Sequence, residues 1–458
     1  MELYYCVLLM SRGFGANLIQ HLYTGAAKQS CFRFSAVIEH GIISSMKLRT
    51  FGRFFILCCF LSVLFTVSTP SLSTPIEKAR QFTRPLEFDY LTWDVNAFMT
   101  KIGQSGLNPW HKLNIEQQHQ LVMRYLYLTN QLEVIQVEIQ QVYADPSIKD
   151  PDTAARVELA QQKALQTSIV SLTPLVESIL QGQVTEIIVE EDIARLGDAV
   201  PPLLFHTTPL PKALIASPRN SIQQDVNISL LADLTLEQID QLENQVEKAT
   251  GESVLVVDVG GIGIYPTMVM RSSNLPWIID TIAHEWTHNY LTLRPLGLNY
   301  DTSPELRTMN ETAAALAGSE ISRLVLARYY PEYISMFEEG QKLASLNWPD
   351  EIFDFRAEMH ATRVHVDELL AADKIAEAEQ YMEERRILFV AHGYEIRKLN
   401  QAYFAFYGAY AATPGGAAGE DPVGPAVRTL REQSASLADF LRTIGKMNSF
   451  EDLQVIFK

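Results

Sequence analysis

The chain has 458 residues, of which 47% are hydrophobic and 20% charged, a balance typical of a globular protein rather than a disordered one. Its net charge of −17 comes without a basic stripe or arm, which argues against nucleic acid and anionic membrane surfaces as partners. All four cysteines precede residue 60, so the rest of the chain has no disulfide, thiol nucleophile or cysteine metal site.

The N-terminal segment resembles a secretory signal. Residues 46–53 are basic, residues 54–67 are apolar, and small residues and prolines follow. We therefore expect residues 46–74 to be a signal peptide or an N-terminal membrane anchor, and residues 1–45 to be a non-native upstream extension. The apolar run is shorter than the about 20 residues that a transmembrane helix needs. The chain is expected to be exported, either free outside the cytoplasm or anchored at the outer face of the membrane.

Residues 75–210 are predicted to form a helical region. Apolar residues recur at helical spacing on a glutamine-rich segment that ends before Pro146. A second helical stretch spans 153–180, and Pro174 is expected to kink or break it. Prolines between 201 and 218 indicate a linker to residues 211–458. We interpret the helical region as a scaffold or interaction region.

Short β-branched and apolar segments predict strands at the start of residues 211–458. The predicted strands are 214–217, 225–231, 252–259 and 262–270. Gly260 and Gly261 separate the last two, and Pro266 suits an edge strand. Gly260, Gly261 and Gly263 would let a ligand approach the backbone closely, although a plain hairpin turn explains them equally well.

The sequence H-E-x-x-H lies at residues 284–288, in an apolar stretch that is predicted to be helical with Asn274 as its N-cap. Positions four apart share one face of a helix, so His284 and His288 can bind one ion. Glu285 then lies beside the ion, where it can accept a proton from water. This pattern predicts a catalytic zinc site. The alternative is that both histidines are ordinary helix residues.

The third ligand distinguishes the classes of zinc hydrolase. Leu291 and Arg294 stand where the class with a third histidine has Gly and His, so that class is excluded. The segment Asn310-Glu311-x-x-Ala314 resembles the pattern around the third ligand of the gluzincin aminopeptidases. This resemblance implies that Glu311 completes the zinc site.

Two features depart from the gluzincin pattern. The interval between His288 and Glu311 is a few residues longer than in the best-known members. Ala315 stands where these enzymes often have an Asp that hydrogen-bonds a ligand histidine, so the partner of that histidine is open. Glu305 and Glu320 are the alternative third ligands, or else ordinary surface carboxylates.

The order of sheet, edge strand and H-E-x-x-H helix is similar to that of the zincins. The resemblance implies an α+β fold that is mostly α, with a small mixed sheet whose edge strand lies over the active-site helix and pairs with the substrate backbone. Helices are expected again after the third ligand. Residues 211–458 would then form the zincin-like metallopeptidase domain.

The C-terminal segment 399–410 resembles a segment of bacterial predicted aminopeptidases. Gluzincins need a hydrogen-bond donor that faces the oxyanion, and we assign this role to Tyr407 or Tyr410. The other candidates are Tyr403, His392 and His365. An aromatic stripe at helical spacing is more often core, so a packing role is the alternative.

We interpret the chain as a zinc metallopeptidase that acts on a peptide or protein substrate, with Zn²⁺ as cofactor and Glu285 as general base. Asp258 or Glu320 could hold the α-amine of an aminopeptidase substrate, but the choice between aminopeptidase and endopeptidase stays open. One alternative is a scaffold protein with a structural or vestigial zinc site. Another is a zinc hydrolase of a non-peptide amide or ester.

Overall fold

The computed structural model describes residues 73–105, 112–144, 148–193, 199–335, 353–409 and 421–457, with residues 339, 342, 417 and 419. Residues 72–458 form one compact unit. Helices dominate its described part and strands form two small sheets there, so the prediction of a mostly helical α+β fold is confirmed. The predicted extension at 1–45 and nearly all of the signal segment at 46–74 lie outside the described residues. Among the described helices, none is long and apolar enough to cross a membrane.

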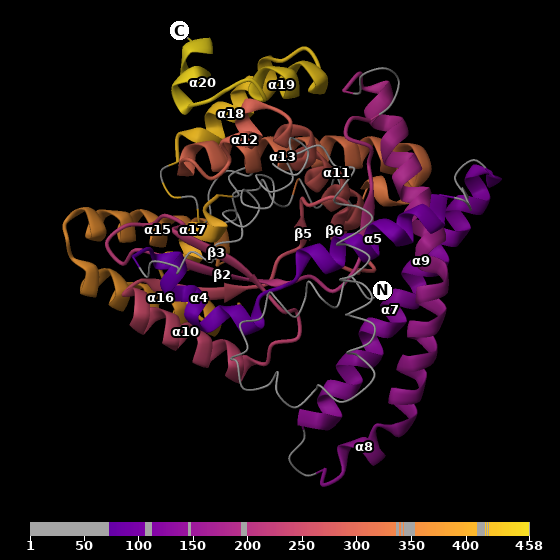
Figure 1. Ribbon diagram of the computed structural model, residues 1–458, viewed down its shortest axis with the longest axis horizontal. Coiled ribbons are helices and arrows are strands. Elements are labelled where there is room, and N and C mark those ends of the chain that lie inside the picture. Colours follow the sequence, from indigo (N-terminus) through magenta and orange to yellow (C-terminus); the bar gives the residue numbers. More distant parts are fainter. Residues whose placement is uncertain are drawn as a thin grey trace, which may run out of the picture. The chain divides into compact units, whose positions relative to one another are not determined.

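Helices occupy most of residues 75–190 (Figure 1). They are α4 (Pro75–Thr83), η2 (Arg84–Leu86), α5 (Tyr90–Ser105), α7 (Ile115–Ala144), α8 (Pro151–Ala154) and α9 (Arg156–Glu190). The long helices α7 and α9 lie side by side. A kink or break in α9 was expected at Pro174, and the helix is not broken there. Ile169 and Val176, on either side of the proline, pack into the same hydrophobic core as α7, which holds the helix together.

The first sheet has the strand order β3-β2-β4 and is antiparallel. Its strands β2 (Lys212–Ser217), β3 (Val226–Leu230) and β4 (Ser253–Val257) confirm three predicted strands. Alternate residues of β2 and β4 pack against α10 (Leu236–Thr250) on one face and against α17 (Gln401–Tyr407) on the other. Both faces are therefore buried.

The second sheet has the order β1-β6-β5. Strand β1 (Phe205–Thr207), which the sequence did not predict, runs parallel to β6 (Thr267–Val269), and β6 is antiparallel to β5 (Gly261–Ile262). Within the described sheet β5 is the edge strand, which agrees with the expectation of an edge strand in this segment. This edge lies near the H-E-x-x-H helix.

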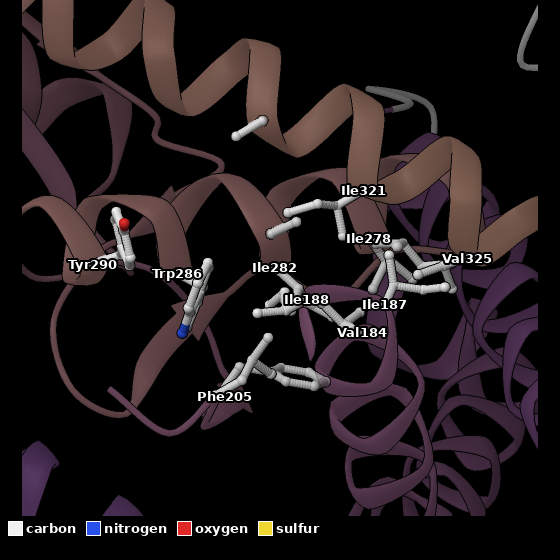
Figure 2. Packing of buried hydrophobic residues seen from close by; sticks show 14 of the residues in the cluster. Val184, Ile187, Ile188, Phe205, Ile278, Ile282, Trp286, Tyr290, Ile321 and Val325 are labelled. Atoms are coloured by element: carbon white, nitrogen blue, oxygen red, sulfur yellow. The ribbon is translucent and has the colours of Figure 1, made fainter. Parts of the chain in front are cut away.

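The centre of the main hydrophobic core is α11 (Leu275–Thr292), which carries the H-E-x-x-H residues. It begins as predicted, because the Asn274 side chain accepts a hydrogen bond from the backbone N–H of Trp277 at 3.1 Å. Figure 2 shows that apolar side chains of α11, including Trp286, lie among residues of α9, of β1 and of α13 (Pro304–Tyr329). One face of α11 is thus buried in the core.

The remaining described helices cover this core and the first sheet. They are α12 (Pro295–Leu298), η3 (Pro331–Tyr333), α15 (Phe355–Ala371), α16 (Ile375–Ala391), α18 (Val423–Gln433), α19 (Leu437–Ile444) and α20 (Phe450–Ile456). Helices α18 and α19 contribute to the main core beside α13. Helices α15 and α16 pair and form a separate cluster with α17.

Candidate metal centre

The two motif histidines lie one turn apart on α11 and converge. The Nε2 atoms of His284 and His288 are 3.0 Å apart, and the rings meet edge to face. Trp286, which is 2% exposed, projects from another face of α11 into the core, where its Nε1 donates a hydrogen bond to the Pro201 carbonyl at 2.9 Å. The buried face therefore fixes the rotation of the helix that presents both histidines.

Glu311 reaches the same point from α13. Its Oε2 atom lies 3.5 Å from the Nε2 atoms of both histidines, and the three possible ligand atoms lie within 4.8 Å of one another. The close packing of α11 and α13 depends on Gly318. A Cβ atom at this position would lie 3.0 Å from the Asp280 carbonyl oxygen and 3.1 Å from the Cβ atom of His284. The structure therefore brings together the three residues that were predicted to bind zinc.

The two carboxylate oxygens of Glu311 differ in their hydrogen bonding. The Tyr300 hydroxyl donates a hydrogen bond to Oε1. Oε2 is buried and has no hydrogen-bond partner among the described residues, although Glu311 is only 4% exposed. A buried carboxylate oxygen is costly unless a hydrogen bond or a cation compensates it. Two imidazole nitrogens and one carboxylate oxygen are a donor set typical of catalytic zinc, so these residues fit the ion.

Asn310 holds His288 in the orientation that a ligand needs. Its Oδ1 lies 2.7 Å from Nδ1 of His288. Because an amide oxygen can only accept, Nδ1 carries the proton, and Nε2 faces Glu311. Asn310 thus takes the position of the histidine partner that Ala315 cannot provide. The sequence pattern contained Asn310, but its role and that of Tyr300 were not predicted.

The charges of the site favour a cation between the ligands. Burial raises the pKa of Glu311, but the adjacent His288 and His284 outweigh this effect and hold the pKa well below its ordinary value. Burial lowers the pKa of His288, but the Glu311 carboxylate outweighs this effect and raises that pKa to about 9. Near neutral pH the imidazolium of His288 therefore compensates the negative charge of Glu311. A bound metal ion would provide the same compensation.

No known relative helps to assign this site. Comparisons of the chain with models of known protein families, with curated proteins and with solved structures found no match. The interpretation of the site therefore depends on the geometry and chemistry of its residues.

Glu285 lies directly beside the edge strand. It is 7% exposed, and burial raises the pKa of its carboxyl group above the ordinary value. A Cβ atom on Gly261 would lie 2.5 Å from Oε1 of Glu285, and one on Gly263 would lie 3.0 Å from the Cβ atom of His288. These glycines were expected to make room for a ligand. In the structure they make room for side chains of the H-E-x-x-H helix itself.

The site opens into a cavity of about 510 Å³. The lining comes from both sheets and from α11, α13 and α17, and includes Lys212, Ala213, Asn227, Ser229, Val259, Gly261, Ile262, Gly263, His284, Glu285, His288, Tyr300, Arg307, Asn310, Glu311 and Phe406. The side chain of Asn289 ties the edge strand segment to α11, because its Nδ2 donates to the Ile264 carbonyl at 3.2 Å and to the Thr267 hydroxyl at 3.1 Å. The cavity can therefore hold a ligand beside the three proposed metal-binding residues.

Among the described oxyanion candidates, none lines the cavity. Tyr407 is absent from the cavity lining, is 38% exposed and packs its ring against Tyr403, with centroids 4.5 Å apart. Tyr410 lies outside the described residues. Nδ1 of His365 lies 3.1 Å from Oε2 of the exposed Glu368. The ring of His392 stacks on the ring of Phe353. The Tyr300 hydroxyl does line the cavity, and its ring lies edge to face on His288, with centroids 6.1 Å apart.

The other candidate carboxylates lie apart from the ligand atoms. Glu320 forms two hydrogen bonds of 2.7 Å with Arg431. Glu305 lines a different cavity. Asp258 pairs with Lys212 and its side chain is 83% exposed. The structure therefore gives Glu311 a position that neither Glu305 nor Glu320 shares.

Proposed function

We propose that this protein is a zinc-dependent peptide hydrolase with a zincin-like arrangement around its site. The observation that carries the proposal is the position of Oε2 of Glu311, which lies 3.5 Å from Nε2 of His284 and of His288 and has no hydrogen-bond partner among the described residues. A zinc ion held there would act as a Lewis acid, which polarises a peptide carbonyl and lowers the pKa of water. The carboxylate of Glu285 is held beside these ligands.

Glu285 is the proposed general base. In hydrolysis the oxygen of water forms a bond to the carbonyl carbon and the C–N bond breaks. Glu285 accepts the proton of the attacking water and passes it to the departing amine nitrogen, so that the carboxylate is regenerated. Its burial supports this role, because a raised pKa makes the carboxylate a stronger base near neutral pH.

Strand β5 is the proposed guide for the substrate backbone. It forms the edge of its described sheet, and Gly261 and Ile262 line the cavity beside Glu285. An extended peptide that pairs with this edge would lie across the histidines. Such pairing recognises the backbone rather than particular side chains, which suits a peptide substrate.

Metal content tests the site. We expect about one zinc per chain in the full-length protein and a large loss in Glu311→Ala, measured by mass spectrometry of the purified proteins. Glu305→Ala is the matched control, because it removes a carboxylate from the same helix outside the metal cavity. A folded, zinc-supplied protein without zinc would contradict the proposal.

Turnover tests the reaction. Glu285→Gln should retain zinc and abolish hydrolysis of a mixture of unmodified peptides that wild type cleaves, followed by liquid chromatography and mass spectrometry. The amide of Gln cannot accept a proton as a carboxylate does, while its shape is similar. Equal cleavage by wild type and Glu285→Gln, or no cleavage by zinc-loaded wild type, would refute the proposed function.

A further inference from the structure

The cavity contains a buried cation that the proposed reaction does not use. Arg307 is 9% exposed and lines the same cavity as the three proposed ligands. Among the described residues, its guanidinium makes one hydrogen bond, from Nη2 to the Ala405 carbonyl at 3.3 Å. Its Nε is buried without a hydrogen-bond partner there. The side chain thus has unused donors at a site that water reaches poorly.

A buried guanidinium of this kind is costly without an anion. Desolvation of an ion destabilises a protein unless a partner of opposite charge compensates it. The Ala405 carbonyl near the C-terminal end of the short helix α17 provides partial compensation, because helix C-termini carry partial negative charge. This interaction leaves most of the five N–H donors of the guanidinium unused. The guanidinium of Arg307 can therefore bind an anionic group of a ligand.

The position of Arg307 specifies where that anion lies. Arg307 and Glu311 are four residues apart on α13, so they share one helix face and are separated by about 6 Å along the axis. An extended peptide advances about 3.3–3.6 Å per residue. If the guanidinium and the carboxylate keep this spacing, the anion and the metal position are one or two substrate residues apart.

The surroundings of Arg307 and the net charge of the protein also bear on the choice of ligand. The residue also lines a second cavity, of about 260 Å³, to which Glu305 and Asp421 contribute. The Asp421 carboxylate accepts hydrogen bonds from the backbone N–H groups of Val423 and Gly424, at 2.9 Å and 3.0 Å. With a net charge of −17, the protein as a whole repels anions, so an anionic substrate needs a local cation.

We propose that Arg307 binds a carboxylate of the substrate, one or two residues from the bond that is cleaved. This inference rests on the proposed peptide hydrolysis and specifies its substrate class. The carboxylate comes either from the C-terminus of the peptide or from an acidic side chain. Guanidinium groups bind carboxylates through two parallel hydrogen bonds, which gives both affinity and orientation. A C-terminal carboxylate would make the protein an exopeptidase that acts from the carboxyl end.

The test compares probes that differ in one charge. Zinc-loaded Glu285→Gln protein is titrated by calorimetry with N-acetyl-phenylalanyl-leucine, with its C-terminal amide, and with N-acetyl-phenylalanyl-glutamate α-amide. We expect the free acid to bind at least about tenfold more tightly than the amide, as the loss of a charge-assisted hydrogen bond predicts. If the side-chain carboxylate is the recognised group, the glutamate amide binds tightly instead.

Variants identify Arg307 as the cause. In Glu285→Gln/Arg307→Gln the preference for the carboxylate should disappear, and in Glu285→Gln/Arg307→Lys part of it should remain. Glu285→Gln/Arg323→Gln is the matched control, because Arg323 is an exposed residue of the same helix. If Glu285→Gln/Arg307→Gln fails to fold, Glu285→Gln/Arg307→Lys makes the comparison, because lysine keeps the charge but cannot form two parallel hydrogen bonds to a carboxylate, so a preference as large as with Arg307 would contradict the inference.

The outcomes separate the two proposals. Equal binding of all three probes, no measurable binding, or a preference that survives Arg307→Gln would overturn the inference, because the metal ion or another group would then hold the carboxylate. Hydrolysis of all three probes at equal rates by wild type would support the peptidase and remove only the role of Arg307. Discrimination between probes without any hydrolysis by wild type would refute the peptidase but retain the carboxylate site.

Discussion

Asn310 and Tyr300 each hold one of the proposed ligands in place. Asn310 fixes the ring of His288 through a hydrogen bond with Nδ1. The Tyr300 hydroxyl donates a hydrogen bond to Oε1 of Glu311, while Oε2 lies near the histidines. Partners of this kind orient ligands and raise their affinity for metal, although they do not bind the ion themselves. Their removal should therefore loosen the zinc ion without abolishing the site.

We expect Asn310→Ala and Tyr300→Phe each to lower zinc affinity by about 10- to 100-fold. Competition with a chromogenic chelator measures this change. Asn244→Ala is the control, because the Asn244 side chain bonds a carbonyl within its own helix, α10. Unchanged affinity in both site variants would show that the ligands are held without these partners.

Gly261 is the residue on which the position of Glu285 depends most directly. Gly261→Ala places a Cβ atom 2.5 Å from Oε1 of Glu285, so the carboxylate must move. We expect zinc content to be retained and the rate of peptide hydrolysis to fall by about 100-fold or more, since a displaced general base loses most of its effect. Gly103→Ala is the control, because no atom lies within 4 Å of its Cβ position. Full activity of Gly261→Ala would contradict the placement of Glu285.

The sequence could predict single residues where local spacing determines the geometry. His284 and His288 follow from their separation on a helix, and Glu311 from a short pattern. Tyr300 lies in the connection between α11 and α13, and its hydroxyl reaches Glu311 only after the two helices pack. No local periodicity encodes this contact. The proposed role of Tyr407 stays a prediction, although the structure leaves this residue out of the cavity lining.

At the scale of elements, a buried ion cluster ties α5, α9 and β1 together. Glu177 of α9 is 1% exposed, and its Oε2 lies 2.5 Å from Nζ of Lys101. Its Oε1 accepts a hydrogen bond from the backbone N–H of Thr207 at 2.7 Å and lies 3.0 Å from Nδ1 of His206. Burial raises the pKa of Glu177, but Lys101 and His206 outweigh it and lower this pKa to about 2.

This cluster should make stability depend on pH. A carboxyl group whose pKa is lower in the folded chain contributes stability above its ordinary pKa of 4.5, and the contribution is lost as pH falls from about 4.5 to about 2. We expect about 3 kcal/mol of the unfolding free energy to disappear across this window in wild type. Denaturant unfolding at a series of pH values measures the loss.

Glu177→Gln should lack this part of the pH dependence. It should also be less stable at pH 7 by about 3–5 kcal/mol, because it leaves the buried Lys101 without its partner. Glu190→Gln is the control, since it breaks an exposed pair with Arg328 and should cost no more than about 1 kcal/mol. Parallel pH profiles for wild type and Glu177→Gln would show that the cluster contributes nothing.

Elements with strong local signals were predicted well, and the others depend on packing. The cap at Asn274 and the apolar pattern located α11, and β-branched residues located β4. Strand β1 escaped prediction because it has only three residues and pairs with the distant β6. At Pro174 the expectation of a break in α9 was wrong, because tertiary packing with α7 outweighs the local cost of a proline.

At the scale of the whole described structure, the N-terminal helices and the candidate metal centre share one hydrophobic core. Val184, Ile187 and Ile188 of α9 lie against the apolar face of α11 (Figure 2). The sequence could indicate a helical region and a metal-binding region by composition and motif. It could not show that they pack together, because contacts between distant segments leave no periodic signal.

This shared core predicts that residues 211–458 do not fold alone. Without α9, the fragment would expose Ile278, Ile282 and Trp286, which are buried in the full chain. We expect the fragment to bind a hydrophobic dye and to unfold without cooperativity, whereas residues 73–458 unfold in a cooperative transition. Circular dichroism and dye fluorescence measure the difference. A fragment that unfolds cooperatively with one bound zinc would show that the two regions are independent domains.

The two faces of α11 also have a consequence for the descent of this protein. Trp286 lies between the paired histidines in sequence, and its hydrogen bond to the Pro201 carbonyl fixes the helix that carries them. A lineage that keeps His284 and His288 must therefore preserve an indole-sized side chain at 286 and a backbone acceptor near 201. Because the indole also packs in the main core, its loss would destabilise the fold whether or not the histidines are kept. Residue 286 and the distant segment around Pro201 are thus expected to vary together.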